Sequence, residues 1–364
     1  VGREVERVTI DTSVAEALTY WQQQDNVEYA EPDGLYHVLA QETSWGWTTV
    51  KAGDAATTNS VTGTGIVVAV VDTGVDYVHE DLDANNWVNT DETAGNSIDD
   101  DANGYVDDYF GYDFIGSYGT SIAPDNDPQD EYGHGTHVSG IIAAENNTVG
   151  VRGIAPSAQI MPVKVLDSTG YGFDSNIADG IRYAVDNGAD IINLSLGSSM
   201  ASNTLKAAVD YAATNNVLVV AASGNESTFS APSYPAVYSS VVSVGATDED
   251  GFKTYWSNWG KVDVMAPGND IVSTIPGDLY DSMSGTSMAS PHAAGVAALI
   301  MQKFATTDAR TVRHILEHTA DDFGVMSGVD YMSGYGMINA LDGTATQTAG
   351  SYVFSDSSFV VTDG

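Results

Sequence analysis

Ser287 stands where a serine hydroxyl could become a nucleophile. It lies between Gly285 and an apolar run, residues 293–300, that predicts a helix. The hydroxyl would then lie at a helix N-terminus, where backbone N–H groups have no partner inside the helix and the dipole favours negative charge. A serine that attacks a carbonyl carbon needs these surroundings, because the intermediate carries an oxyanion beside the nucleophile. Serine at a helix start is also a common cap, so the position alone leaves both interpretations open.

Three other residues could complete the chemistry of a nucleophilic serine, which needs a base, a carboxylate that orients the base, and a second donor for the oxyanion. Asp72 follows a β-branched run, residues 66–71, that predicts a buried parallel strand. His134 opens a second predicted helix, and Asn225 follows another apolar strand. Each has a structural alternative as a cap, a surface side chain or a turn residue. Together they predict a site at the carboxyl edge of a parallel sheet.

Four short blocks carry these residues in the order Asp, His, Asn, Ser, namely residues 70–74, 134–138, 222–225 and 285–292. In this order they closely resemble the blocks of the subtilisin-like serine proteases (subtilases), and the resemblance runs from about residue 40 to about residue 342. It implies that Ser287 is the nucleophile and that His134 is the general base and later the general acid. It also implies that Asp72 orients the imidazole and that the Asn225 amide joins the Ser287 N–H in an oxyanion hole.

Strands and helices alternate along the chain, which predicts an α/β fold with a doubly wound, mostly parallel sheet and helices on both faces. The strands are expected at residues 66–71, 159–166, 190–196, 217–222 and 240–245, and the helices at 174–187, 203–214, 287–300 and 309–318. Residues 40–342 would form the catalytic domain, and residues 343–364 a Ser/Thr/Gly-rich extension or linker.

By the same resemblance, residues 1–39 form a partial inhibitory propeptide, a small α+β remnant that binds the enzyme as its own partner. Leu39 precedes Ala40-Gln41, which looks like a mature start, so we expect self-processing after Leu39. The chain begins with Val1 and not with methionine, which predicts processing or trimming at its start.

The composition is strongly acidic, with 50 acidic against 12 basic residues and a formal net charge of −38. Nucleic acid is therefore an improbable partner, and no apolar run is long enough to cross a membrane. The chain has no cysteine, so disulfides and a thiol nucleophile are excluded. We expect a secreted, monomeric enzyme that acts on proteins and peptides. Its acidity is either an adaptation to saline surroundings or ordinary for a secreted protein.

Calcium would balance part of the charge. Residues 99–107 contain the spacing D-x-D-x-N-G-x-x-D, the first nine positions of an EF-hand-type loop. The candidate ligands are Asp99, Asp101, Asn103, the Tyr105 carbonyl and Asp107. Phe110 occupies the place of the final bidentate glutamate, so a remaining oxygen must come from elsewhere. The alternative is a solvated acidic turn.

The resemblance implies two further calcium sites. The first would use Gln41, Asp81, Asn147, Val149 and Val151, the last two through carbonyls. The second resembles the loop that thermitase-like members carry before the histidine block, with Asp125, Asp127 and Asp130 as ligands. We therefore expect two or three structural Ca²⁺ sites.

The resemblance also implies a pocket for the residue before the scissile bond, formed by small side chains that suit an apolar or aromatic substrate residue. Its members would be Ser195, Leu196, Gly197, Ala222, Ser223, Gly224 and Ser233. Three alternatives remain at this point. They are a sedolisin, which would use a glutamate in place of His134, a non-catalytic calcium-dependent binding protein on a protease scaffold, and a precursor that residues 1–39 keep inactive.

Overall fold

The computed structural model describes residues 19–21, 23, 24, 27, 41–116, 123–228, 232–306, 308–323 and 328–345. Two compact units divide the chain, residues 1–40 and residues 41–364. The predicted propeptide lies almost entirely outside the described residues, and so do the junction after Leu39 and the extension beyond residue 345. The domain boundaries and the processing site therefore stay predictions.

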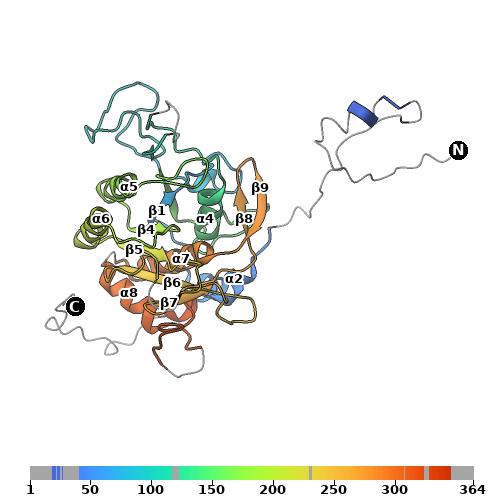
Figure 1. Cartoon of the computed structure of the whole chain (residues 1–364), viewed down its shortest axis with the longest axis vertical. Coiled ribbons are helices and arrows are strands. Elements are labelled where there is room, and N and C mark those ends of the chain that lie inside the picture. The colour runs from blue at the N-terminus through green and yellow to red at the C-terminus, as the bar shows by residue number, and fades with distance from the viewer. Residues whose placement is uncertain are drawn as a thin grey trace. The chain divides into compact units, whose positions relative to one another are not determined.

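Seven parallel strands form the central sheet in the order β2-β3-β1-β4-β5-β6-β7 (Figure 1). They are β1 Val67–Asp72, β2 Tyr112–Asp113, β3 Gln159–Lys164, β4 Ile191–Leu194, β5 Leu218–Ala222, β6 Val241–Thr247 and β7 Val264–Pro267. The chain leaves β1 toward one side of the sheet and returns to β4 on the other side. The carboxyl end of β1 is therefore the switch point at which sheets of this kind build their sites.

Helices cover both faces of the sheet. They are α4 His134–Ala143, α5 Asp174–Asp186, α6 Asn203–Thr214, α7 Thr286–Phe304 and α8 Ala309–His318. Alternate residues of β1 point to opposite faces: Val68 and Val70 belong to the core cluster that includes α4 and α7, whereas Ala69 and Val71 belong to the cluster of α5 and α6 (Figure 1). A strand buried on both faces needs a continuous apolar run, which β1 has.

The remaining elements lie around this core. They are α2 Trp45–Thr49, α3 Ala52–Asn59, the 3₁₀ turn η1 Asp83–Asn85, the antiparallel pair β8 Ile271–Ile275 and β9 Leu279–Met283, and α9 Ala340–Gly343. None of the helices that the structure describes is both long and apolar enough to cross a membrane.

The predicted doubly wound α/β fold is confirmed, and α6 and α8 have the predicted bounds. Helix α5 ends one residue before the predicted end, ahead of Gly188, whose φ of 84° ends the helix. The sequence did not predict β2, β7 or the β8–β9 pair. Strand β2 has only two residues, and β9 is partly polar and mostly exposed, so neither has a readable burial pattern.

Candidate active site

Asp72 and His134 meet at the carboxyl end of β1. Asp72 is fully buried, and His134 Nδ1 lies 2.7 Å from Asp72 Oδ1, which also accepts the Thr73 backbone N–H at 2.7 Å. Gly135 allows this approach, since a Cβ atom there would stand 2.0 Å from the Gly74 carbonyl oxygen. Burial lowers the pKa of His134, but the charge and hydrogen bond of Asp72 outweigh it, so the pKa is raised overall.

A buried lysine supports the turn that follows Asp72. Lys164 lies beside Asp72 in the β1–β3 register, and its Nζ donates to the Thr73 carbonyl at 2.6 Å. Its charge is paired with Glu131 at 2.7 Å. The sequence did not predict this role, because no pattern around an isolated lysine at a strand end indicates which distant segment it will contact.

Ser287 is the second residue of α7 and is partly buried. Its Oγ donates to the Ser195 carbonyl at 3.1 Å, and Ser195 Oγ donates to the Ser287 carbonyl at 2.8 Å. Within the described part of the chain no hydrogen bond joins Ser287 Oγ to His134. Hydrogen bonds between catalytic groups are often long or poorly aligned before substrate binds.

Two hydrogen-bond donors converge beside Ser287. Thr286 N and Thr286 Oγ1 both donate to Asn225 Oδ1 at 2.9 Å, which fixes the Asn225 amide. Asn225 Nδ2 has no acceptor among the described residues. A Cβ atom placed on Gly285 would stand 3.5 Å from both Asn225 Nδ2 and Ser287 N. The two N–H groups therefore border the same small space, as an oxyanion hole requires.

The predicted pocket residues come together where three segments meet. A Cβ atom on Gly197 would stand 2.9 Å from Ser233 Cβ, and one on Gly224 would stand 2.4 Å from Ser233 Oγ. Ser223 is fully buried, and its carbonyl accepts the Ser233 N–H at 2.8 Å. The other predicted members lie at the strand ends that lead into two of these segments: Ser195 and Leu196 follow β4, and Ala222 ends β5.

An acidic residue that the sequence analysis missed borders this pocket. Glu226 Oε2 accepts from Asn258 Nδ2 at 2.6 Å and from Ser233 Oγ at 3.4 Å. The side chain is exposed, so its charge is available to a substrate but screened by water. In the sequence, only its position directly after Asn225 indicated that Glu226 could lie near the substrate pocket.

The residues of the first calcium site implied by the resemblance lie together around Asp81. The Asp81 side chain is fully buried. Asp81 Oδ1 accepts from Asn147 Nδ2 at 2.8 Å, and Asp81 Oδ2 accepts the Val151 N–H at 2.9 Å. Gln41 Nε2 lies 3.0 Å from the Val151 carbonyl oxygen, and Val149 N donates to Asn147 Oδ1 at 2.9 Å. Burial raises the pKa of Asp81 to about 7. Gln41, Asn147, Val149 and Val151 carry amide and carbonyl oxygens of the kind that Ca²⁺ prefers. Both Asp81 oxygens accept N–H groups in this structure, and a calcium site here stays a prediction.

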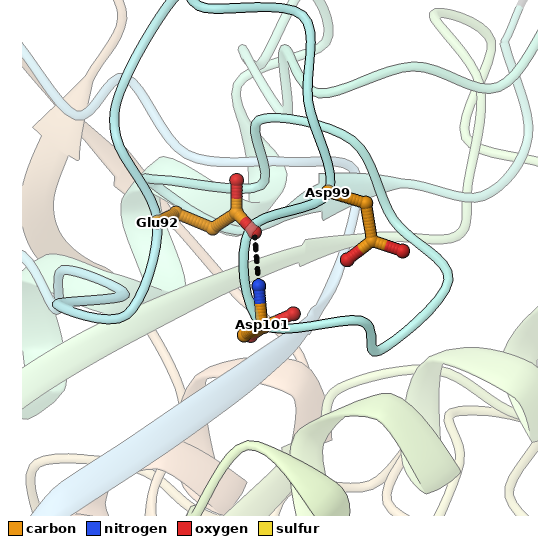
Figure 2. Close-up of side chains that lie close together, drawn as sticks. All are labelled: Glu92, Asp99 and Asp101. Carbon is orange, nitrogen blue, oxygen red and sulfur yellow. Dashed lines mark hydrogen bonds between the residues drawn. The ribbon is translucent and has the colours of Figure 1, made fainter.

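A second group of carboxylates lies in the acidic loop. One carboxylate oxygen each of Glu92, Asp99 and Asp101 lies within 4.8 Å of the others (Figure 2). The Asn103 N–H donates to Asp99 Oδ1 at 3.1 Å and to Asp101 Oδ1 at 3.0 Å, and Tyr105 N donates to Asn103 Oδ1 at 2.8 Å. Asp99 and Asp101 thus meet as predicted, joined by Glu92, which the sequence analysis did not select.

Two predicted ligands are engaged by protein donors. Asp107 accepts the N–H groups of Asn96 and Ser97 at 2.9 and 2.8 Å, one on each oxygen. The buried Asp130 carboxylate accepts five hydrogen bonds, from Thr73 Oγ1, Tyr132 N, Gly133 N, Thr136 N and Thr136 Oγ1. These contacts hold both carboxylates in place, and calcium ligation by either residue stays a prediction.

Asp125 and Asp127 are exposed. Asp125 Oδ1 accepts the Asp127 N–H at 3.0 Å, and Asp127 Oδ1 accepts the Tyr77 hydroxyl at 2.7 Å. A calcium site at this loop stays a prediction.

Comparisons with known proteins define the class. Residues 63–336 match the model of the subtilase family. The chain is 40% identical over 316 residues to M-protease of Shouchella clausii (86% of this chain, 73% of the relative). It is 40% identical over 320 residues to subtilisin E of Bacillus subtilis (86% and 74%). It is 42% identical over 322 residues to the thermophilic serine proteinase of Bacillus sp. strain AK1 (86% and 72%).

The chain belongs to the subtilase family. It is a serine endopeptidase and acts on protein substrates.

Proposed function

We propose that this protein is a secreted, calcium-stabilised endopeptidase that uses Asp72, His134 and Ser287 as its catalytic triad. The observation that carries the proposal is the 2.7 Å contact between His134 Nδ1 and buried Asp72 at the carboxyl end of β1. Ser287, in the first turn of α7, is the nucleophile that complements this pair.

In the acylation step, Ser287 Oγ attacks the scissile carbonyl carbon while His134 Nε2 takes the hydroxyl proton. The hydroxyl must first leave the Ser195 carbonyl, which a rotation about the Ser287 Cα–Cβ bond achieves. Asp72 stabilises the imidazolium, which then gives its proton to the leaving amine. Water enters, His134 takes a proton from it, and the water oxygen attacks the acyl carbon. As the bond between that carbon and Ser287 Oγ breaks, His134 returns the proton to Ser287 Oγ, which releases the acid product and restores the enzyme.

The oxyanion accepts hydrogen bonds from Asn225 Nδ2 and Ser287 N. Thr286 holds Asn225 Oδ1, so the amide nitrogen is oriented before the substrate arrives. Donors that are already oriented cost no reorganisation during the reaction.

Substrate would pair as an extended strand with residues 193–197 and place one side chain between Gly197, Gly224 and Ser233. The small residues favour an apolar or aromatic side chain there. Because Glu226 borders this pocket, its negative charge would also allow a lysine or arginine side chain to bind there, so the preference for apolar side chains would not be strict.

Calcium would be held by Asp81 with oxygens of Gln41, Asn147, Val149 and Val151. Bound there, the ion would supply structural stabilisation by neutralising a buried carboxylate and joining three segments.

The direct test is intact-mass spectrometry of the full chain before and after reaction with a fluorophosphonate, with a Ser287→Ala variant as the control. One adduct on Ser287, absent from the variant, on a chain that begins at Ala40 supports both the triad and cleavage after Leu39. No adduct on a full-length chain indicates a precursor blocked by residues 1–39. A correctly cut and folded chain without an adduct favours the non-catalytic binding protein instead.

A further inference from the structure

Helix α8 carries two histidines on the side that is turned away from the core. Its inner side chains, Val312, Ile315 and Leu316, are buried in the core cluster that residues of α7 also form. His314 and His318 lie one turn apart on the other side, the first half-buried and the second exposed. The proposed catalytic and calcium sites use neither histidine.

The two imidazole rings are close enough to share one metal ion. Their centroids lie 3.8 Å apart, with an angle of 34° between the ring planes. In a tetrahedral site with metal–nitrogen bonds of about 2.0–2.1 Å, two ligand nitrogens lie about 3.3 Å apart. Rings separated by a similar distance can each turn one nitrogen toward the same ion.

A backbone carbonyl fixes the tautomer of His318. His318 Nδ1 lies 3.0 Å from the His314 carbonyl oxygen. Because a carbonyl oxygen only accepts, Nδ1 carries the proton, and Nε2 of the neutral ring keeps its lone pair. Histidines that bind metals almost always hold their second nitrogen in this way, often on a backbone carbonyl. The exposed ring is therefore held in the tautomer that a metal ligand needs.

The surroundings of the pair favour neutral rings and a bound cation. Burial and the neighbouring His318 lower the pKa of His314 from its ordinary value near 6.5, so the His314 ring is uncharged at neutral pH. Helix α8 ends at His318, and the C-terminal end of a helix carries the negative pole of the helix dipole. A cation held by both rings would lie at that pole.

The two arginines of the same helix are paired with acids. Arg313 Nε lies 2.6 Å from Glu317 Oε1, and Arg310 Nε lies 3.8 Å from Asp308 Oδ1. These carboxylates offset much of the repulsion that the arginines would exert on a cation at the histidine pair.

We propose that His314 and His318 form a site for a divalent transition-metal ion that prefers imidazole, such as Zn²⁺, Ni²⁺ or Cu²⁺, with water as its remaining ligands. Nitrogen donors suit these ions, whereas Ca²⁺ takes oxygen ligands, so this site is chemically distinct from the proposed calcium site. The ion would join two consecutive turns at the end of α8 and stabilise the folded chain. The proposal depends neither on the catalytic roles nor on calcium.

The experiment titrates Zn²⁺ calorimetrically into the full chain carrying Ser287→Ala, in an excess of calcium that fills oxygen sites. The variants are His314→Gln, His318→Gln and the two together. The matched control is His134→Gln, the same substitution at a histidine outside α8, which identifies any ion held at the candidate active site.

Because two ligands would hold one ion, we expect each single variant to weaken the site about tenfold or more and the double variant to lose little beyond that. His134→Gln should leave the affinity of the α8 site unchanged within about twofold. Independent histidines would instead give losses that add. Unchanged affinity in either single variant, or additive losses, would overturn the proposal, whatever the result for calcium or for the fluorophosphonate reaction.

A second measurement does not need folded variants. Crystals of the Ser287→Ala chain soaked in zinc show bound ions by anomalous scattering. A peak between His314 and His318 supports the site. No peak on α8, or one bound by a single histidine or by carboxylates alone, refutes it.

Discussion

Asp72 uses one oxygen for both of its hydrogen bonds, to His134 Nδ1 and Thr73 N, while its buried Oδ2 has no partner among the described residues. The negative charge is therefore compensated mainly through the imidazole. This explains why the pKa of His134 is raised although desolvation of the ring lowers it. At the scale of single residues, the charge of Asp72 sets the protonation of the base.

The pH dependence of the Asp72→Asn variant tests this coupling. The base must be neutral to act, so a raised pKa of His134 places the acid limb of kcat/KM above the ordinary value near 6.5. Without the charge of Asp72, burial outweighs the weaker effect of the Asp130 charge, and the limb should move below that value. We also expect kcat to fall by about 10⁴, the loss known for this substitution in a serine protease triad. Peptide hydrolysis between pH 5 and 9 measures both.

The control for that profile is Asn225→Ala. It should lower kcat by about 10²–10³, a magnitude measured in a subtilisin, without moving the acid limb. An acid limb that stays in place in Asp72→Asn would contradict the role given to Asp72.

The second prediction for a single residue concerns the role of Glu226 in substrate specificity. Glu226→Gln should lower kcat/KM for a peptide with lysine before the scissile bond about 1.4- to fivefold relative to one with phenylalanine, because an exposed charge pair contributes about 0.2–1 kcal/mol. The charge-matched control is Glu249→Gln, an exposed acid in another turn. If the two variants give the same ratio, Glu226 does not contact the substrate residue.

At the scale of secondary-structure elements, the loops after β1 and α4 carry the proposed calcium ligands, and the strand and the helix fix where these loops begin. Asp81 follows β1, Asn147 and Val151 follow α4, and Gln41 begins the second compact unit. Their hydrogen bonds join three segments that are distant in sequence. A bound ion at this junction would restrain all three at once.

Removal of calcium tests this junction. An ion at about 100 times its Kd stabilises the native state by about 2.7 kcal/mol, so an excess of chelator should lower the Tm of the Ser287→Ala chain by about 5 °C or more. Asp81→Asn should abolish part of that difference. Glu80→Gln, an exposed neighbour, should retain all of it. Identical melting curves with calcium and with chelator would refute structural calcium at the site around Asp81.

For the whole molecule, the net charge of −38 opposes compaction through self-repulsion. Salt screens such repulsion, since the Debye length falls from about 30 Å at 0.01 M to about 3 Å at 1 M ionic strength. Only part of the charge is local to the proposed calcium sites, because acids such as Asp248, Asp250 and Asp322 lie outside them.

We therefore expect the Tm of the calcium-loaded Ser287→Ala chain to rise as NaCl increases from 0.01 to 1 M. Sucrose at matched osmolarity is the control, since it carries no charge. A Tm that is constant or falls with salt would argue against adaptation to saline surroundings and for ordinary secreted-protein acidity.

Much of the fold could be predicted because its signals are local. The strand before Asp72 was predicted from its β-branched apolar run, and the helices from 203 to 214 and from 309 to 318 from the alternation of elements along the chain, which depend on neighbouring residues. Strands β2 and β9 were missed because a two-residue strand and a mostly exposed one have no such pattern.

The sequence by itself determined the fold class and the residues that could do the chemistry, since blocks around Asp72, His134, Asn225 and Ser287 are contiguous. Only the tertiary structure decided which oxygens remain available. Asp81, Asp107 and Asp130 match ligand patterns, and all three accept hydrogen bonds from protein donors, whereas Glu226 matches none and borders the predicted pocket. The physical reason is that a carboxylate's partners come from segments far apart in sequence, so their identity depends on how those segments pack.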